Sequence, residues 1–248
     1  MGYLKLENVS KCYGESRIFD SLTFDIERNK IVSILGPSGC GKSTILKLIS
    51  GLEAPTSGDI LLENSSIINN TNICSFMSQE GDLLAWRTLL QNLILPLEIN
   101  GLQKSLARQV GEDRLKVFNL SEAKDLYPSE SSGGMNQRIN LLRTFMLERE
   151  IVLLDEPFSK IDQITKIDLM NYLIRIWQER KSTVIIVTHD LDEALYLSDT
   201  IIVLSKNPTE ISYKIHMESK NKQESYLTSE DYVSKRRNLL NIIRNASI

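Results

Sequence analysis

The sequence predicts an α/β protein whose mostly parallel sheet is covered by helices on both faces. Four short runs of apolar residues have the length of strands, and helical patterns separate them: residues 30–35, 151–154, 183–187 and 201–204. Strands with this composition are buried on both faces, as in a parallel sheet between two helix layers. The first run also leads directly into a glycine-rich loop and then a helical segment, which is typical of a phosphate-binding site.

Size and composition indicate an ordinary globular protein. The chain has 248 residues, of which 42% are hydrophobic and 25% charged. Its formal net charge of -3 disfavours a nucleic-acid partner, which would usually require a basic surplus. The three cysteines lack CxxC spacing, which favours reduced thiols over disulfides or a metal site. The first residues do not resemble a signal peptide, and no window approaches the roughly 18 apolar residues of a membrane span.

The segments on either side of the glycine-rich loop also show the patterns of strands and helices. Residues 3–9 alternate apolar and polar side chains, and residues 18–26 repeat the pattern, so the two segments are expected to pair as strands. A helix is expected over residues 43–49 and another strand around residues 60–62. Residues 64–72 are rich in Ser and Asn and are interpreted as a loop with room for one edge strand.

The rest of the chain is divided by its helical patterns. A largely helical subdomain is predicted over about residues 83–136, inserted in a domain that covers residues 1–205. Residues 206–248 are polar and lysine-rich, with apolar positions at helical spacing between Tyr232 and Ile243. We expect this short C-terminal extension to be a solvated helix that packs on the core, with a regulatory role as the alternative.

The glycine-rich loop fits the pattern G-x-x-x-x-G-K-[ST] in full. Its backbone N–H groups can surround phosphate oxygens, and the following helix adds its positive end. Lys42 is expected to neutralise the β- and γ-phosphates, and the Ser43 hydroxyl to ligate Mg²⁺. The predicted nucleotide-binding residues of this loop are Gly36, Pro37, Ser38, Gly39, Cys40, Gly41, Lys42, Ser43 and Thr44.

Two adjacent carboxylates follow the apolar run 151–154. Asp155 ends the predicted strand, where it can hold Mg²⁺ or the water molecules around it. Glu156 is placed to accept a proton from a water molecule that attacks the γ-phosphate. A solvated acidic strand end is the plainer alternative for Glu156.

Together with the string Ser-Gly-Gly-Met-Asn-Gln at residues 132–137, these motifs resemble the ATP-binding subunit of an ATP-binding cassette (ABC) transporter. The resemblance covers residues 3–205 and implies a P-loop NTPase fold of the ABC type, with an antiparallel β subdomain and an inserted helical subdomain. It further implies ATP and Mg²⁺ as cofactors. A second copy of the chain would complete an ATP sandwich.

The resemblance also assigns roles to individual residues. Gln79 would contact Mg²⁺ and the attacking water, and His189 would contact the γ-phosphate and position that water. Tyr13 stands where the family stacks an aromatic ring on adenine, with a buried strand-end tyrosine as the alternative. The implied catalytic residues are Glu156, His189, Gln79 and Lys42, and the implied metal ligands are Ser43, Gln79 and Asp155. The signature segment and the loop after the catalytic strand add the nucleotide-binding residues Ser132, Gly133, Gly134, Gln137 and Asp162.

The chain departs from the family's pattern beside the signature turn. Ser131 replaces the usual leucine, and Asn136 replaces the usual basic residue. Neither change removes a phosphate ligand, so any difference is expected in coupling strength or basal rate. Lys160 and Ile161 also differ from the family's small residue and leucine.

Residues 80–88, with Asn92 and residues 95–98, are similar to the importer branch for nitrate, sulfonates, taurine and related small solutes. This resemblance implies an integral-membrane permease, docked in a groove at residues 79–88 with an exposed Trp86. Core packing is the alternative for Trp86. An extracytoplasmic solute-binding protein would act indirectly, and the chain would lie at the cytoplasmic face of the membrane as a peripheral subunit.

The sequence disfavours two functions other than import. A non-transport ABC ATPase that acts on nucleic acid or the ribosome would carry coiled-coil arms or a second cassette, and the sequence has neither. A module that binds ATP without turnover is disfavoured because both Glu156 and His189 are present.

Overall fold

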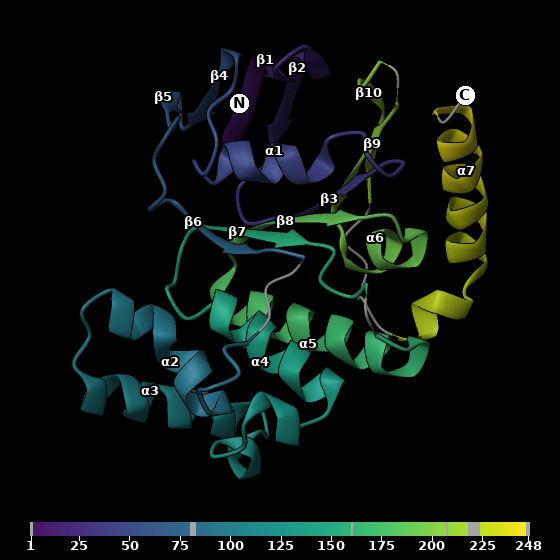
Figure 1. The fold of residues 1–248 in the computed structure, drawn as a ribbon. Coiled ribbons are helices and arrows are strands. Elements are labelled where there is room, and N and C mark those ends of the chain that lie inside the picture. Colours follow the sequence, from purple (N-terminus) through teal and green to yellow (C-terminus); the bar gives the residue numbers. More distant parts are fainter. Residues whose placement is uncertain (1, 80–82, 160, 207, 218–223, 247–248) are drawn as a thin grey trace. The chain divides into compact units, whose positions relative to one another are not determined.

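The computed structural model describes residues 2–79, 83–159, 161–206, 208–217 and 224–246 (Figure 1). Outside the described residues lie Glu80, Gly81 and Asp82 of the predicted groove, Lys160, and residues 207, 218–223 and 247–248 of the predicted extension. The chain divides into two compact units. The first comprises Met1–Phe76, Glu150–Glu156 and Lys181–Ile248, and the second comprises Met77–Arg149 and Pro157–Arg180.

A six-stranded sheet in the order β10-β9-β3-β8-β7-β6 forms the centre of the first unit. Strand β3 pairs in parallel with β8 and β9, β7 pairs in parallel with β8, and β10 is antiparallel to β9. The predicted mostly parallel sheet is therefore confirmed. The strands are β3 (Ile31–Leu35), β6 (Cys74–Met77), β7 (Ile151–Asp155), β8 (Thr183–Thr188), β9 (Thr200–Leu204) and β10 (Ile211–His216).

Helices cover both faces of this sheet, as predicted. Successive side chains of a strand point to opposite faces, so Ile202 belongs to one buried cluster and Ile201 to another. The first cluster includes the apolar side chains of α1 (Lys42–Ile49). The second includes residues of α6 (Leu191–Leu197) and α7 (Glu230–Ala246).

A second sheet of the first unit is antiparallel and has the order β2-β1-β4-β5. Its strands are β1 (Leu4–Tyr13), β2 (Ser16–Ile26), β4 (Ser57–Leu62) and β5 (Ser65–Ser66). The pairing of β1 with β2 and the edge strand within residues 64–72 are confirmed. Strand β1 runs further than the predicted 3–9, because an irregularity between Leu6 and Val9 shifts the register and interrupts the alternation of side chains.

The second unit is built mainly from helices. They are α2 (Leu89–Ile99), α3 (Lys104–Val117), α4 (Gly133–Thr144) and α5 (Gln163–Arg180), with short 3₁₀ turns η1 (Ser121–Ala123) and η2 (Pro128–Glu130). Helix α2 packs against α3 and α4, and α4 packs against α5. The described part of the predicted helical segment 83–136 holds α2, α3 and the start of α4.

The C-terminal residues of the first unit add β10, the 3₁₀ turn η3 (Glu224–Thr228) and α7. Tyr232 and Leu239 of α7 are buried in the second cluster, which confirms the helical spacing seen in the sequence. The Tyr232 hydroxyl donates to Asp192 Oδ1 at 2.6 Å and so joins α7 to α6. Among the described residues, none of the helices is both long and apolar enough to span a membrane.

Candidate functional site

The glycine-rich loop lies in the first unit, between the carboxyl end of β3 and the start of α1, as the motif requires. Gly41 precedes the helix with a φ of 91°, in the left-handed region that favours glycine. A Cβ atom there would lie 2.6 Å from Ile18 Cγ2, so a larger residue would clash as well as strain the backbone. The loop is thus closely packed against β2.

Lys42 is held on the loop by its own ammonium group. Lys42 Nζ donates to the carbonyl oxygens of Gly36 at 2.8 Å and Pro37 at 2.9 Å, and the residue is only 6% exposed. A lysine ammonium has three N–H donors, so two of them fix its position and one remains for a phosphate oxygen. The charge is therefore pre-positioned where the loop would bind phosphate.

Ser43 and Asp155 meet although they are far apart in the sequence. Ser43 Oγ donates to Asp155 Oδ1 at 3.0 Å, and Asp155 is 5% exposed at the carboxyl end of β7. Burial raises the pKa of Asp155, the Ser43 hydrogen bond opposes this shift, and the charge of Glu156 adds to it. A cation beside this pair would favour the ionised carboxylate.

These two oxygen ligands fit Mg²⁺. Magnesium prefers hard oxygen ligands and commonly keeps one or two protein ligands plus phosphate and water oxygens. Among the residues that the structure describes, there is no group of three or more His, Cys, Asp or Glu side chains that could bind a metal ion. The donor set therefore suits a magnesium ion that arrives with a nucleotide.

Glu156 and His189 lie together at the carboxyl edge of the sheet. His189 Nδ1 is 3.2 Å from Glu156 Oε1, the glutamate is half-buried and the histidine is exposed. Glu156 has a φ of 47°, and its N–H donates to Val187 O at 2.9 Å. A non-glycine residue in this conformation is strained. The backbone bond to β8 thus holds the carboxylate in its unusual position.

The turn that carries His189 is fixed by residues that the sequence reasoning missed. Thr188 Oγ1 donates to the buried Glu193 Oε2 at 2.5 Å and accepts from the Asp190 N–H at 3.0 Å. Asp190 Oδ1 in turn caps α6 by accepting from the Asp192 N–H at 2.8 Å. The spacing Asp190-x-x-Glu193, typical of a capped helix start, was the available signal.

Tyr13 ends β1 and is 45% exposed, so the buried alternative for this tyrosine is wrong. Its hydroxyl donates to Glu53 Oε2, and Lys11 Nζ lies 4.8 Å from the ring centroid. Partial burial and then the Glu53 hydrogen bond raise the pKa of the Tyr13 hydroxyl. An exposed ring face suits base stacking, which stays a prediction.

The second unit brings the signature residues around a hollow of 490 Å³, lined in part by Ser132, Gly133, Gly134 and Asp162. Ser132 caps α4 by accepting from the Met135 N–H at 3.2 Å. A Cβ atom on Gly133 would meet nothing within 4 Å, so the hollow reaches the backbone there. Asp162 Oδ1 accepts from the Thr165 N–H at 3.1 Å and so caps α5. The first helical turn of α4 thus opens onto the hollow at Gly133, whereas Gly134 packs close to Thr165 Cγ2.

Two predicted residues of the second unit lie elsewhere. Gln137 does not line this hollow among the residues that define it, and its Nε2 donates to Pro157 O at 2.5 Å. Gln79 is exposed and follows β6. Both residues keep their assigned roles as predictions.

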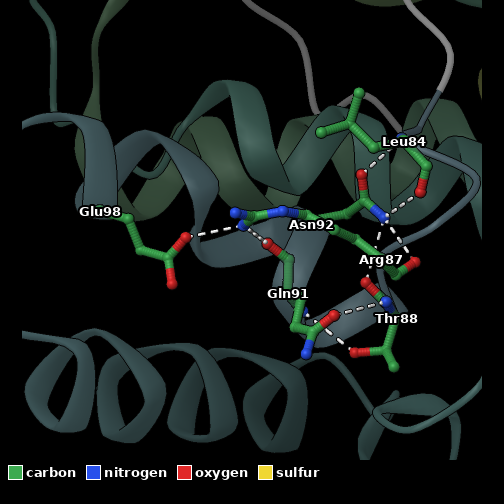
Figure 2. Close-up of polar contacts among 6 residues, drawn as sticks. All are labelled: Leu84, Arg87, Thr88, Gln91, Asn92 and Glu98. Atoms are coloured by element: carbon green, nitrogen blue, oxygen red, sulfur yellow. Dashed lines mark hydrogen bonds and ion pairs between the residues drawn. The ribbon is translucent and has the colours of Figure 1, made fainter.

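The described part of the predicted groove, residues 83–88, is organised by a buried amide (Figure 2). Asn92 is 0% exposed; its Oδ1 accepts from the Leu84 N–H at 2.7 Å. Its Nδ2 donates to the carbonyls of Leu84 at 3.0 Å, Arg87 at 3.0 Å and Thr88 at 3.1 Å. Trp86, on the loop so fixed, is 74% exposed, so core packing of this side chain is wrong.

Two further contacts hold the same loop (Figure 2). Arg87 Nη1 pairs with Glu98 Oε2 at 2.7 Å, and the Thr88 and Gln91 side chains form a reciprocal capping box at the start of α2. Trp86 thus lies on a loop whose backbone is hydrogen-bonded on both sides of it, at Leu84, Arg87 and Thr88.

Comparisons with known proteins identify the family to which the chain belongs. The sequence profile described as "ABC transporter" matches residues 19–159. The formylaminopyrimidine import ATP-binding protein ThiZ of Halalkalibacterium halodurans is 39% identical over 206 residues, covering 83% of this chain and 80% of the relative. The aliphatic sulfonates import ATP-binding protein SsuB of Bacillus thuringiensis subsp. konkukian is 36% identical over 202 residues, covering 82% and 79%.

A solved structure is similar to this chain in its fold. It is an ATP-binding cassette in a dimeric post-hydrolysis state bound to ADP and Pi, and it is similar to this chain with a TM-score of 0.75 and 29% sequence identity. The alignment covers 88% of this chain and all of that cassette. The chain belongs to the ABC transporter family and is an ATPase with the fold of its ATP-binding cassettes.

Proposed function

We propose that the chain is the ATP-hydrolysing subunit of an importer, and that it powers uptake of a small solute, such as a sulfonate, taurine or nitrate, through a separate permease. The observation that carries the proposal is the pairing of Glu156 with His189 at 3.2 Å, beside a phosphate loop whose Ser43 bonds Asp155. A carboxylate and a histidine at this edge of the sheet are suited to activating a water molecule. This supports ATP hydrolysis and not only nucleotide binding.

In the proposed reaction, Glu156 accepts the proton of a water molecule that attacks the γ-phosphate in line with the leaving oxygen. Because an ionised Glu156 can only accept, the contact between the two side chains requires an N–H on Nδ1 of His189. Lys42 stabilises the charge that develops on the phosphate oxygens. Each residue thus has one task that its position in the first unit supports.

Ser43 and Asp155 would hold Mg²⁺, with Gln79 as the further ligand that the family resemblance assigns. When bound, the ion supplies positive charge to the phosphate oxygens. The raised pKa of Asp155 fits this role, because a neighbouring cation offsets the cost of ionising a buried carboxylate.

The hollow at Ser132, Gly133 and Gly134 is proposed to receive the triphosphate of a second copy. Phosphate suits this place because the first N–H groups of α4 and the positive end of the helix point to it. The similar cassette solved as a dimer supports such an assembly. Two copies would then enclose two ATP molecules head to tail.

The loop of Trp86 is proposed to bind the permease. A large exposed aromatic side chain on a fixed loop is typical of an interaction surface. The named relatives serve import of aliphatic sulfonates and of formylaminopyrimidine, which supports a small-solute importer. The chain would then lie at the cytoplasmic face of the membrane, and a solute-binding protein would act on the far side.

The replacement Glu156→Gln tests the general base. Turnover should fall by a factor of about 10² or more, because the water loses its proton acceptor, while ATP-bound dimers accumulate. Glu150→Gln is the matched control, since Glu150 directly precedes the amino end of the same strand and bonds Tyr3 and Arg28 instead. Undiminished hydrolysis in Glu156→Gln would sink the assignment.

The replacement Ser132→Arg tests the shared site. A long cation in the hollow should block ATP-dependent dimerisation, measured by sedimentation, while ATP still binds the monomer. Dimers that form as readily as in the native protein would contradict the cross-subunit role.

Membrane coupling is tested by co-purification with the permease, followed by identification of the solute that its binding protein holds. Trp86→Ala should weaken capture of the permease about tenfold or more, as expected for a central aromatic contact. Leu106→Ala, at another exposed apolar residue of the second unit, should not. Equal capture by both variants would argue against the Trp86 loop as the docking surface.

A further inference from the structure

The two departures from the family's signature pattern are in direct contact. Ser131 Oγ donates to Asn136 Oδ1 at 2.6 Å, and Asn136 Nδ2 donates to the carbonyl of Pro128 at 2.8 Å. Ser131 Oγ also lies 3.2 Å from Pro128 O. The three residues form a closed set that links the 3₁₀ turn η2 to the first turn of α4.

The chemistry of these groups admits one arrangement. A hydroxyl carries a single proton, so the 2.6 Å bond to Asn136 takes it and the longer contact with Pro128 is secondary. Asn136 must then direct its NH₂ group to Pro128, since the reverse orientation would oppose two carbonyl oxygens. All three polar groups are half-buried, which makes an unpaired group costly.

The contact encloses the signature turn. Ser132, Gly133 and Gly134 lie between the two partners in the sequence, and the Asn136 N–H donates to Ser132 O at 2.9 Å. Two adjacent glycines leave such a turn free to adopt many backbone conformations. A side-chain link from Ser131 to Asn136 removes part of that freedom.

We propose that Ser131 and Asn136 act as one positioning pair that holds the Ser132 hydroxyl and the N–H groups of the turn in the geometry that binds the partner's phosphate. This inference rests on the proposed function of the turn. Neither side chain contacts the phosphate itself, so each acts through the turn. The pair is matched: a leucine in place of Ser131 would remove the hydroxyl that donates to Asn136 Oδ1, and a basic residue in place of Asn136 would leave Ser131 only the longer contact with the Pro128 carbonyl.

A double-mutant cycle tests the pairing. Ser131→Ala, Asn136→Ala and the double variant are made in the Glu156→Gln background, and ATP-dependent dimerisation is measured by sedimentation. Each single variant should weaken dimerisation about fivefold, and the double variant should be no weaker than the worse single one. ATP affinity of the monomer should not change. Ser131→Thr keeps the hydroxyl and should restore native dimerisation.

Ser129→Ala is the matched control, because Ser129 lies in the same 3₁₀ turn and its hydroxyl is exposed outside the pair. A second measurement needs no dimer. The Met135 N–H donates to Ser132 Oγ in this turn, and its amide exchange in the nucleotide-free monomer should accelerate about fivefold in each single variant and remain native in Ser129→Ala.

The outcomes separate this inference from the proposed function. If Glu156→Gln does not dimerise with ATP, or Ser132→Arg does not prevent it, the shared site is wrong. If both behave as expected and the alanine variants at Ser131 and Asn136 dimerise and exchange like Ser129→Ala, the positioning pair is wrong. Additive effects of the two single changes would equally overturn it.

Discussion

Replacing Asn92 perturbs the Trp86 loop without touching Trp86. The Asn92 amide is fully buried and contacts four backbone groups, the N–H of Leu84 and three carbonyls (Figure 2). Its two N–H donors serve those three carbonyls, so one donor is shared. The carbonyls of Leu84 and Thr88 also accept from the backbone N–H groups of Arg87 and Asn92, so the loss falls mainly on the Leu84 N–H and the Arg87 carbonyl.

The magnitude follows from the bond count. Asn92→Ala removes two donors and one acceptor, which at about 1 kcal/mol each lowers the free energy of unfolding by about 3 kcal/mol. Asn92→Asp retains the volume and the acceptor for the Leu84 N–H but places a buried carboxylate against three carbonyl oxygens. Its cost should be on the order of 3–5 kcal/mol, because the charge has no donor for its second oxygen.

The assay is urea unfolding of the second unit, followed by amide exchange at Leu84. Exchange at Leu84 should accelerate in Asn92→Ala, which lacks the acceptor. Asn100→Ala is the matched control, since Asn100 is an exposed asparagine at the end of the same helix with a single side-chain bond to Pro96 O. It should change stability by less than about 1 kcal/mol.

Asn92→Asp distinguishes the loss of hydrogen bonds from the loss of side-chain volume at this position. Asn92→Asp leaves no cavity, so a loss of stability in this variant comes from the polar groups and not from lost volume. A native-like unfolding midpoint for Asn92→Asp would therefore refute the bond count. Both variants keep Trp86, so weaker permease capture by either would show that the loop conformation matters for docking.

Two further predictions concern the first and the second unit respectively. Asp155→Asn should abolish magnesium-dependent hydrolysis, yet raise the melting temperature in nucleotide- and metal-free buffer. The sign follows from the raised pKa of Asp155: ionisation costs stability above that pKa, so the gain is full at pH 8 and fades as the pH falls through it. A lower melting temperature at pH 8 would contradict this. Gly111→Ala should destabilise by about 1–3 kcal/mol in urea unfolding, because the new Cβ atom would lie 2.3 Å from Ile94 Cγ2. A stabilised variant, as helix propensity alone predicts, would show that α2 and α3 can separate at low cost.

The fold was largely predictable because its signals are local. Continuous apolar runs identify the central strands, and the phosphate-loop motif fixes a strand before it and a helix after it. The N-terminal strand was predicted too short, since the irregularity after Leu6 interrupts the period of two on which strand prediction depends. This irregularity arises from the pairing of β1 with β2, and no sequence pattern near Leu6 indicates it.

The residues of the candidate site could be predicted where they belong to a known motif. Contacts between residues that are far apart in the sequence could not be predicted in this way. The pairing of Ser43 with Asp155 follows from two motifs that meet at one edge of the sheet. The bond from Tyr13 to Glu53 joins residues 40 positions apart, and no pattern in the chain connects them. The same holds for the contact between Ser131 and Asn136, which the sequence marked only as two separate departures.

Three residues whose positioning role was not predicted from the sequence each lie about one turn into a helix. Asn92 in α2 and Asn136 in α4 are the fourth residue after the N-cap, and Glu193 in α6 is the third. Because helical side chains point toward the N-terminus, a polar residue at these positions lies over the preceding loop.

All three bond that preceding segment: the Trp86 loop, the turn before the signature, and the Thr188 hydroxyl beside His189. A polar residue one turn into a helix that follows a functional loop is therefore a candidate positioning residue on physical grounds. Substitution there should alter the loop's conformation while every ligand-contacting residue stays in place. In this chain, substitutions of Asn92, Asn136 and Glu193 should therefore show how much function depends on the conformation of each loop, because they leave the residues that contact ligands or partners unchanged.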